Sequence, residues 1–358
     1  MSLPTVHHET RASRRAHGAR WRRGAVLPAM LPAAALALGL SACASPTTES
    51  PAQGTPSPTT STTAGFAPLT VDNCGSEVVF DAPPERVVTI KSTATETMLA
   101  LGLEDRLVGT AFSDGPLPEG LADAAAAVPV LSEKVPGQEA LLASEPDLVY
   151  AGWESNFSAE GAGERPTLAA LGIASYVSPA ACLGEGYQPD PLTFDVVFDG
   201  IREVGAIFGV QERAEDLVAE QEATLAGVDA PTGTTTALWF SSGSDTPYVG
   251  AGIGAPQMIM DAAGLTNIFA DVHESWTSVG WEQVVAADPD VIVLVDSAWG
   301  STEKKIGVLE SNPATSQLTA VREKRYLVVP FPASEAGVRN ADAVADLVAQ
   351  LAALPAVG

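Results

Sequence analysis

The sequence predicts an α/β protein made of two similar lobes with mostly parallel sheets, joined by a helical segment. Short runs of β-branched and apolar residues alternate with Ala- and Leu-rich segments of helical spacing, a pattern typical of βαβ units. The alternation occurs twice, once on each side of a helical stretch at 191–230. With 358 residues, 46% of them hydrophobic and 18% charged, the chain is too apolar for a disordered protein and long enough for more than one core.

Residues 1–42 are expected to be a secretory signal peptide. Six arginines between positions 11 and 23 precede an apolar run at 24–40, which is short for a membrane span and contains two prolines. A twin-arginine export signal is a minor alternative. Arg14 and Arg15 are adjacent, although His17 and Gly18 stand where that signal needs an apolar residue.

The apolar run ends in Leu40, Ser41, Ala42 and Cys43, which resemble the bacterial lipobox. This match implies cleavage before Cys43 and lipidation of that cysteine, which would anchor the protein to the outer face of the cell membrane. An ordinary signal peptide with a cysteine near its end is the alternative. Residues 43–68 are rich in Ser, Thr, Pro and Gly, so we expect a flexible tether between the anchor and the fold.

The charge balance is strongly acidic, with 19 Lys and Arg against 44 Asp and Glu and a net charge of −25. Loss of six Arg and one Glu with residues 1–42 would leave 13 basic and 43 acidic residues, a net charge of −30. Such a chain repels nucleic-acid phosphates, so no nucleic-acid partner is expected. Of the four histidines only His273 would remain, which excludes a site built from several imidazoles, and neither a metal nor a cofactor is predicted.

Two cysteines would remain besides the lipidated Cys43. Cys74 and Cys182 would meet an oxidising compartment, where an even pair suggests a disulfide, with two free thiols as the alternative. The bridge would tie the start of the folded region to a loop much later in the chain.

Residues 69–190 are expected to form the N-terminal lobe. Its strands are predicted at β-branched or apolar runs, and its helices at the segments between them that end near Gly, Ser or Pro. The expected strands are 87–90, 107–110, 147–150 and 174–177, and the expected helices are 94–101, 138–144 and 168–171.

Residues 191–230 are expected to form the helical segment, including an inter-lobe helix. Apolar residues recur at helical spacing from Phe194 to Phe208, Gly209 then interrupts, and a charged helix is expected at 211–228. A second α/β series is expected over 231–358, with strands that include 237–240 and 291–295. These residues would form the C-terminal lobe.

One segment of each lobe resembles the other. Residues 137–149 parallel residues 280–292, and each segment places a Glu seven residues before a Pro-Asp pair that leads into an apolar strand. This similarity indicates two related lobes with a cleft between them. Ligands of open α/β sheets bind beyond the carboxyl ends of the strands, so the cleft is the expected binding site.

With these features the chain resembles the bacterial ABC-importer substrate-binding proteins that handle iron–siderophores, haem and cobalamin. The resemblance covers roughly residues 70–358 and is carried by residues 84–88, Glu96, the two Pro-Asp segments and the mid-chain helix. It implies two lobes held by a long rigid helix, as in class III periplasmic binding proteins, and a monomer that delivers a small-molecule ligand to ABC permease subunits. In this family one surface Glu on each lobe docks onto permease arginines. The matching residues are Glu139 and Glu282, for which a plain exposed acid at a helix start is the alternative.

Several stretches, including IKSTATETMLALGL, YAGWESNF and VVPFPASEAGVRN, are similar to one actinobacterial branch of this family. That branch is identified with the des-glutamyl precursor of the deazaflavin coenzyme factor 420. Such a ligand has a flat tricyclic ring, a polyol and a phosphodiester that ends in a carboxylate. It would need aromatic rings for stacking and donors for its anionic groups.

The ligand-binding candidates are aromatic, cationic, hydroxyl, amide or carboxylate residues expected near the cleft. They are Lys91, Ser92, Thr93, Trp153, Glu154, Asn156, Trp239, Ser241, Ser242, Tyr248, Trp276, Trp299 and Arg339. Lys91 follows the first strand and opens a helix, so its ammonium group and the helix N-terminus would face the same anion. Core packing is the alternative for Trp239, and an ordinary surface charge is the alternative for Arg339.

Other ligands and functions stay open at this point. His273 and Tyr248 could supply an axial ligand to haem, and cobalamin fits the same architecture, whereas the chain lacks the Arg and Lys clusters that anionic ferric siderophores use. An exported enzyme is a competing function, but neither a GxxxxGK[ST] phosphate loop nor a GxSxG elbow occurs, and no catalytic residue is predicted. We therefore expect a lipid-anchored extracytoplasmic binding protein rather than an enzyme.

Overall fold

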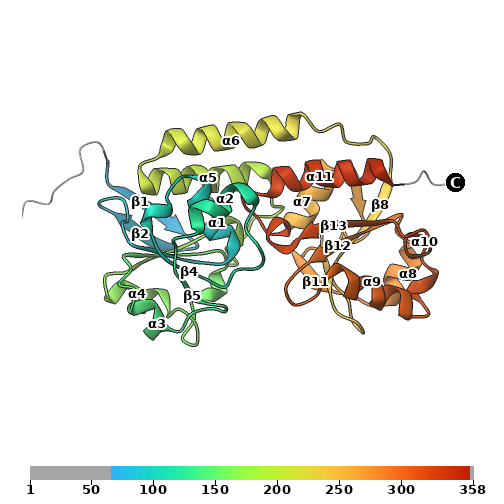
Figure 1. Cartoon of the computed structure of the whole chain (residues 1–358), viewed down its shortest axis with the longest axis horizontal. Coiled ribbons are helices and arrows are strands. Elements are labelled where there is room, and N and C mark those ends of the chain that lie inside the picture. The colour runs from blue at the N-terminus through green and yellow to red at the C-terminus, as the bar shows by residue number, and fades with distance from the viewer. Residues whose placement is uncertain (1–65, 355–358) are drawn as a thin grey trace, which may run out of the picture. The chain divides into compact units, whose positions relative to one another are not determined.

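A computed structural model describes residues 66–354 (Figure 1). The expected signal peptide, Cys43 and the linker up to residue 65 lie outside the described residues. Within the described part the chain forms two α/β lobes, both in one compact unit, and a helical segment follows the N-terminal lobe in sequence. The α/β class and the two-lobe architecture expected from the sequence are confirmed.

The N-terminal lobe is built on a five-stranded parallel sheet with the order β5-β4-β3-β6-β7. Its central strand β3 is buried at all four positions, as expected for a parallel strand covered on both faces. The strands are β3 (Val87–Ile90), β4 (Leu107–Ala111), β5 (Val130–Ser132), β6 (Leu148–Ala151) and β7 (Ala174–Val177). The helices are α1 (Ser92–Ala100), α2 (Glu119–Ala125), α3 (Gln138–Leu142) and α4 (Arg165–Ala170).

An antiparallel hairpin precedes this sheet, formed by β1 (Leu69–Asn73) and β2 (Ser76–Phe80). Cys74 lies in the turn of the hairpin and forms a disulfide with Cys182, with 5.3 Å between their Cα atoms. The predicted bridge is therefore confirmed, and it links the hairpin to the segment that follows β7 across 108 residues of sequence.

Two helices form the segment between the lobes. Helix α5 (Phe194–Phe208) begins at Thr193, whose side chain accepts a hydrogen bond from the backbone N–H of Val196, and ends at Gly209 with a φ of 69°. Helix α6 (Gln211–Ala226) runs over both α5 and α11 (Asn340–Ala353) in Figure 1. Because α5 belongs to the N-terminal side and α11 to the C-terminal lobe, α6 is the inter-lobe helix.

The C-terminal lobe contains a six-stranded mixed sheet. Strands β8, β10, β12 and β13 are parallel, whereas β9 pairs antiparallel with β8 and β11 pairs antiparallel with β9. The strands are β8 (Thr235–Ser242), β9 (Tyr248–Gly250), β10 (Leu265–Asn267), β11 (Trp276–Ser278), β12 (Val291–Asp296) and β13 (Tyr326–Pro330). The other helices are α7 (Ala255–Ala262), α8 (Trp281–Ala287), α9 (Thr302–Ser311) and α10 (Thr319–Arg322).

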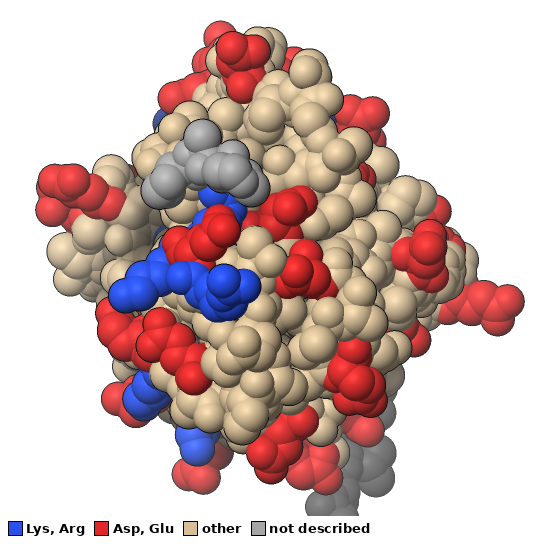
Figure 2. All heavy atoms as spheres, turned by 90° about the vertical axis from the view of Figure 1, so that its right-hand side faces the viewer, with Lys and Arg blue, Asp and Glu red and all other residues tan. Residues whose placement is uncertain are grey.

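The surface reflects the acidic composition. On the face that Figure 2 shows, acidic side chains are spread widely, while the few Lys and Arg gather toward one side. Among residues 66–354, no helix combines the length and the apolar character that a membrane span requires.

Candidate functional site

A cavity of about 300 Å³ lies between the two lobes. The N-terminal lobe contributes residues that follow β3, β6 and β7, and the C-terminal lobe contributes the start of β9, the start of α7 and the segment after β13. The cavity therefore lies at the carboxyl ends of parallel strands, the usual place for a ligand in open α/β sheets. Its lining residues are Thr93, Gly152, Trp153, Glu154, Ser155, Ser178, Ala180, Ala181, Cys182, Leu183, Gln188, Pro189, Leu192, Tyr248, Ile253, Gly254, Ala255, Ser275, Trp276, Ser334, Glu335 and Ala336.

One wall of the cavity is a pair of stacked aromatic rings. Tyr248 and Trp276 lie on the neighbouring antiparallel strands β9 and β11, and their ring centroids are 6.0 Å apart with an interplanar angle of 14°. Tyr248 remains 40% exposed, so much of its surface is open to a ligand. Stacked rings of this kind offer a flat apolar face and a negative quadrupole.

Two carboxylates line the same cavity. Glu335 follows β13 and accepts a hydrogen bond of 2.6 Å from the indole N–H of Trp153, which belongs to the other lobe. Burial raises the pKa of Glu335 to about 7, although the Trp153 donor and the charge of Lys91 oppose that rise. Glu154 accepts a 2.8 Å hydrogen bond from the backbone N–H of Leu183, another residue of the lining, and this bond fixes its carboxylate.

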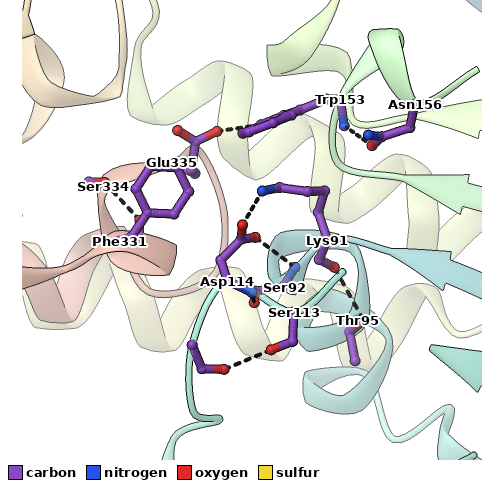
Figure 3. A network of polar contacts seen from close by, with 11 residues as sticks. Lys91, Ser92, Thr95, Ser113, Asp114, Trp153, Asn156, Phe331, Ser334 and Glu335 are labelled. Carbon is purple, nitrogen blue, oxygen red and sulfur yellow. Dashed lines mark hydrogen bonds and ion pairs between the residues drawn. The ribbon is translucent and has the colours of Figure 1, made fainter. Parts of the chain in front are cut away.

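Beneath the cavity lies a buried cluster centred on Lys91 (Figure 3). Its ammonium group forms an ion pair with Asp114, and both side chains are 1% exposed. Burial lowers the pKa of Lys91 and raises the pKa of Asp114, while each partner's charge opposes the shift of the other. Three rings surround the ammonium group: Nζ lies 3.5 Å from the ring centroid of Trp153, 4.3 Å from that of Phe112 and 5.2 Å from that of Phe331.

The backbone around Lys91 is constrained. Lys91 has a φ of 82°, a region that non-glycine residues rarely adopt, and its carbonyl accepts hydrogen bonds from the backbone N–H and the hydroxyl of Thr95. Gly152 passes so close that a Cβ atom there would lie 2.5 Å from Oγ1 of Thr93 and 2.8 Å from Cβ of Lys91. Only glycine permits this approach of the cavity floor to the start of α1.

A second ion pair connects the lobes. Arg339, at the start of α11, donates two hydrogen bonds of 2.6 and 2.5 Å to the carboxylate of Glu96 on α1, and a third of 2.8 Å to the carbonyl of Pro116. Glu96 is 1% exposed and the Arg339 side chain is 13% exposed. Burial raises the pKa of Glu96, while the hydrogen bonds and charge of Arg339 oppose that rise.

Five of the predicted ligand-binding residues line the cavity. They are Thr93, Trp153, Glu154, Tyr248 and Trp276. Asn156 lies just behind the wall, where its side-chain carbonyl accepts a hydrogen bond of 3.2 Å from the backbone N–H of Trp153 and holds that segment in place.

The structure places the other candidates elsewhere. Lys91 and Ser92 are buried below the cavity, where the backbone N–H of Ser92 donates to Asp114 rather than to an open anion site. Arg339 is engaged by Glu96. The expected cation of the cleft is therefore not in its lining, because each positive group is matched by a carboxylate that the sequence did not place beside it.

Four further candidates lie outside the cavity lining. Strand β8 continues to Ser242, so Trp239 lies within the strand, is fully buried and packs in the core. Ser241 is buried in the same strand, and neither it nor Ser242 lines the cavity. Trp299 is 51% exposed in the turn after β12 and packs edge-on against Phe331, with ring centroids 4.6 Å apart, outside the cavity lining.

Sequence reasoning missed Glu335 and Asp114. Each follows a parallel strand at its carboxyl end, β13 for Glu335 and β4 for Asp114, and that position is the signal that could have identified both. The two acids Glu139 and Glu282 are both exposed, in the first turns of α3 and α8. Among residues 66–354, no group of three or more His, Cys, Asp or Glu is arranged to hold a metal ion.

Comparisons with known proteins agree with this geometry. Residues 87–333 match the family model described as periplasmic binding protein. A cobalamin-binding protein of Halobacterium salinarum is 30% identical over 242 residues, which are 63% of this chain and 58% of that protein. This chain thus spans less than two thirds of the length of that relative.

Two further relatives match over more of their length. An uncharacterized ABC transporter substrate-binding lipoprotein of Bacillus subtilis is 25% identical over 289 residues, which are 78% of this chain and 84% of that protein. A solved structure described as an ABC-type Fe3+-hydroxamate transport system from Saccharomonospora viridis has 31% sequence identity and a TM-score of 0.68, and the match covers 79% of this chain and 98% of that one.

Proposed function

The chain belongs to the periplasmic binding protein family, and on that premise we propose that it is the substrate-binding protein of an ABC importer, with the inter-lobe cavity as its ligand site. The observation that supports this proposal most strongly is the cavity itself. It is lined by both lobes and combines a pair of stacked aromatic rings with a few fixed polar groups. It also lies at the carboxyl ends of parallel strands. No chemical conversion of the ligand is part of this function.

For the ligand we propose a metal complex with an organic chelator, of the cobalamin or ferric-hydroxamate kind. The names of the relatives from H. salinarum and S. viridis support this class. The lining supports it as well, because apolar and aromatic surface with scattered hydrogen-bonding groups suits a ligand rich in amides. A cavity of about 300 Å³ would hold only part of such a ligand, and the remainder would extend through the open side.

The deazaflavin precursor is the second candidate, because the stacked pair Tyr248 and Trp276 would suit a flat tricyclic ring. Its phosphodiester and carboxylate would need donors, and the lining contains no Lys, Arg or His. For haem, Tyr248 lines the cavity, whereas His273 is 73% exposed and pairs with Asp190 beside it. The cobalamin and ferric-hydroxamate class therefore has the stronger support.

Delivery would use the two exposed acids. We propose that Glu139 and Glu282 dock onto arginines of the permease, one on each lobe, as the resemblance to the importer family implies. Both lie in the first turn of a helix and are exposed, which leaves their carboxylates accessible to a partner. Lipidation of Cys43 would hold a monomer at the outer face of the membrane within reach of that permease.

The proposal is tested by titrating the purified protein with cyanocobalamin and with ferric desferrioxamine B, and by measuring uptake in cells. Binding should raise the thermal midpoint, with an increase that grows as the logarithm of the ligand concentration, and leave the ligand unchanged. A Glu139→Gln/Glu282→Gln double variant should lose uptake and keep its ligand affinity. A matched Glu164→Gln/Glu310→Gln variant, which removes one exposed acid from each lobe elsewhere, should keep both. A loss of affinity in the first variant would contradict the docking role.

A further inference from the structure

The charged residues of the cavity lining are all acidic. Glu154 comes from the N-terminal lobe and Glu335 from the C-terminal lobe, and none of the lining residues is Lys, Arg or His. The groups that face Glu335 are Lys91 and Asp114 from below, the indole N–H of Trp153 and the phenol of Tyr248, whose pKa is raised by burial and by Glu335 and Glu274. Carboxylate charge in the cavity is therefore not balanced by any cation of the lining.

Lys91 does not change this balance. Its ammonium group is the nearest positive charge, but it forms an ion pair with Asp114 under the Trp153 ring, and both side chains are 1% exposed. Whether the proton lies on Lys91 or on Asp114, the two groups together carry no net charge. As a whole the pair adds no net charge to the cavity, and the Lys91 ammonium group offsets only part of the negative field of Glu335, whose pKa stays raised.

A neighbouring hollow is acidic too. A hollow of about 290 Å³ adjoins it, and the two share Gln188 and Ile253 in their linings. The ionisable residues of this hollow are Glu185, Glu274, His273 and Asp190. His273 and Asp190 form a pair in which the Nε2 and Oδ2 atoms are 2.9 Å apart. A charged ligand in the cavity would therefore lie beside a second acidic hollow, in a chain whose net charge is −25.

The aromatic wall adds an independent preference. Tyr248 and Trp276 line the same space as Glu335, and the faces of aromatic rings attract ammonium and guanidinium groups within about 6 Å of the ring centroid. Aromatic faces next to carboxylates are the usual elements of protein sites for organic cations. Aromatic rings alone would accept a neutral ligand equally well, so it is their combination with the carboxylates that sets the charge preference.

We propose that the inter-lobe cavity and the acidic hollow beside it select a ligand that carries a positive charge, an ammonium or guanidinium group on the part that is bound, and discriminate against anionic ligands. This inference rests on the proposed function, which assigns ligand capture to the cavity, and adds the charge class of the ligand. Within the cavity the cation would lie between the carboxylate of Glu335 and the ring faces of Tyr248 and Trp276.

The test uses three ferric complexes with one common core. Ferric desferrioxamine B has a pendant ammonium group and one positive charge, its N-acetyl derivative is neutral, and its N-succinyl derivative carries one negative charge. At low ionic strength we expect the cationic complex to bind at least about ten-fold more tightly than the neutral one. The neutral complex should in turn bind more tightly than the anionic one. Glu335→Gln should reduce the ratio between the cationic and neutral complexes, whereas Glu323→Gln, an exposed acid outside the cavity, should preserve it.

Each outcome decides between the two proposals. Equal affinities, or tighter binding of the anionic complex, would overturn the charge preference and leave the proposed function in place. Tight binding of neutral cyanocobalamin without binding of the cationic complex would likewise overturn the charge preference and leave the proposed function in place. Failure of all four probes to bind would overturn both proposals. Both would be supported if the three ferric complexes bind in the expected order of affinity and if Glu335→Gln, but not Glu323→Gln, reduces the ratio between the cationic and neutral complexes.

Discussion

The ion pair between Arg339 and Glu96 gives a quantitative test of how the two lobes are held together. Replacing Arg339 by Leu removes two hydrogen bonds to a carboxylate that is 1% exposed and leaves that carboxylate without its cation. Loss of one partner from a buried pair typically costs about 3–5 kcal/mol. We expect Arg339→Leu to lower the free energy of unfolding by about this amount at pH 8.

The loss of stability in Arg339→Leu should depend on pH, and the raised pKa of Glu96 determines whether it grows or shrinks as pH falls. Without Arg339, which holds that pKa down, the carboxyl group of the variant takes up a proton more readily in the folded state. A group whose folded pKa is raised stabilises the fold at low pH and loses this contribution as pH rises through the folded pKa. The deficit of the variant should therefore shrink from pH 8 to pH 5.

Urea denaturation followed by tryptophan fluorescence measures both effects. Arg202→Leu is the matched control, because Arg202 forms ion pairs with Asp199 and Glu215 at the surface and should lose no more than about 1 kcal/mol. A Glu96→Leu/Arg339→Leu double variant should recover most of the stability, since no charge is left buried. A loss for Arg339→Leu as small as that of the control, or one independent of pH, would refute the reasoning.

Three further predictions concern the cavity and its supports. Because burial raises the pKa of Glu335 to about 7, its carboxyl group loses its proton as pH rises. Affinity for ferric desferrioxamine B, measured by calorimetry, should therefore increase by up to about 30-fold from pH 5.5 to pH 8.0, while affinity for the N-acetyl derivative should change little. An affinity for ferric desferrioxamine B that is independent of pH would contradict this. Cys74→Ser/Cys182→Ser, which opens a loop of 108 residues, should cost about 2–5 kcal/mol in urea titrations, and an unchanged midpoint would be inconsistent with a stabilising bridge. Gly152→Ala, which places a methyl group 2.8 Å from Cβ of Lys91, should cost about 1–3 kcal/mol and weaken ligand binding, and wild-type behaviour would exclude the close contact.

Local patterns in the sequence predicted much of the fold. The expected strands at 87–90 and 174–177 agree with β3 and β7 at both ends, and Gly209 marks the end of α5. These features depend on the chain's own apolar runs and turn residues. The hairpin of β1 and β2 was not predicted, because each strand is only five residues long and mixes polar with apolar residues instead of forming a continuous apolar run.

The site could be predicted only in part, for a physical reason. Trp153 was identified from residue type and position after a strand, Trp276 from residue type alone, and both line the cavity. The state of Lys91 depends on Asp114, which lies 23 residues away and meets it only after β4 is placed beside β3. Tertiary pairing of this kind decides whether a charge is open to a ligand, and it leaves no signal in the local sequence.

Whether the inter-lobe cavity holds the ligand can be measured directly by native mass spectrometry and calorimetry of a blocked variant. Ser155 is exposed and lines the cavity, so Ser155→Trp should fill it with an indole ring while the fold is kept, and Glu160→Trp, an exposed position outside the lining, is the control. We expect the unaltered protein and the control to form a one-to-one complex with ferric desferrioxamine B or cyanocobalamin, and Ser155→Trp to bind at least about ten-fold more weakly. Undiminished binding by Ser155→Trp would place the ligand elsewhere and contradict the account.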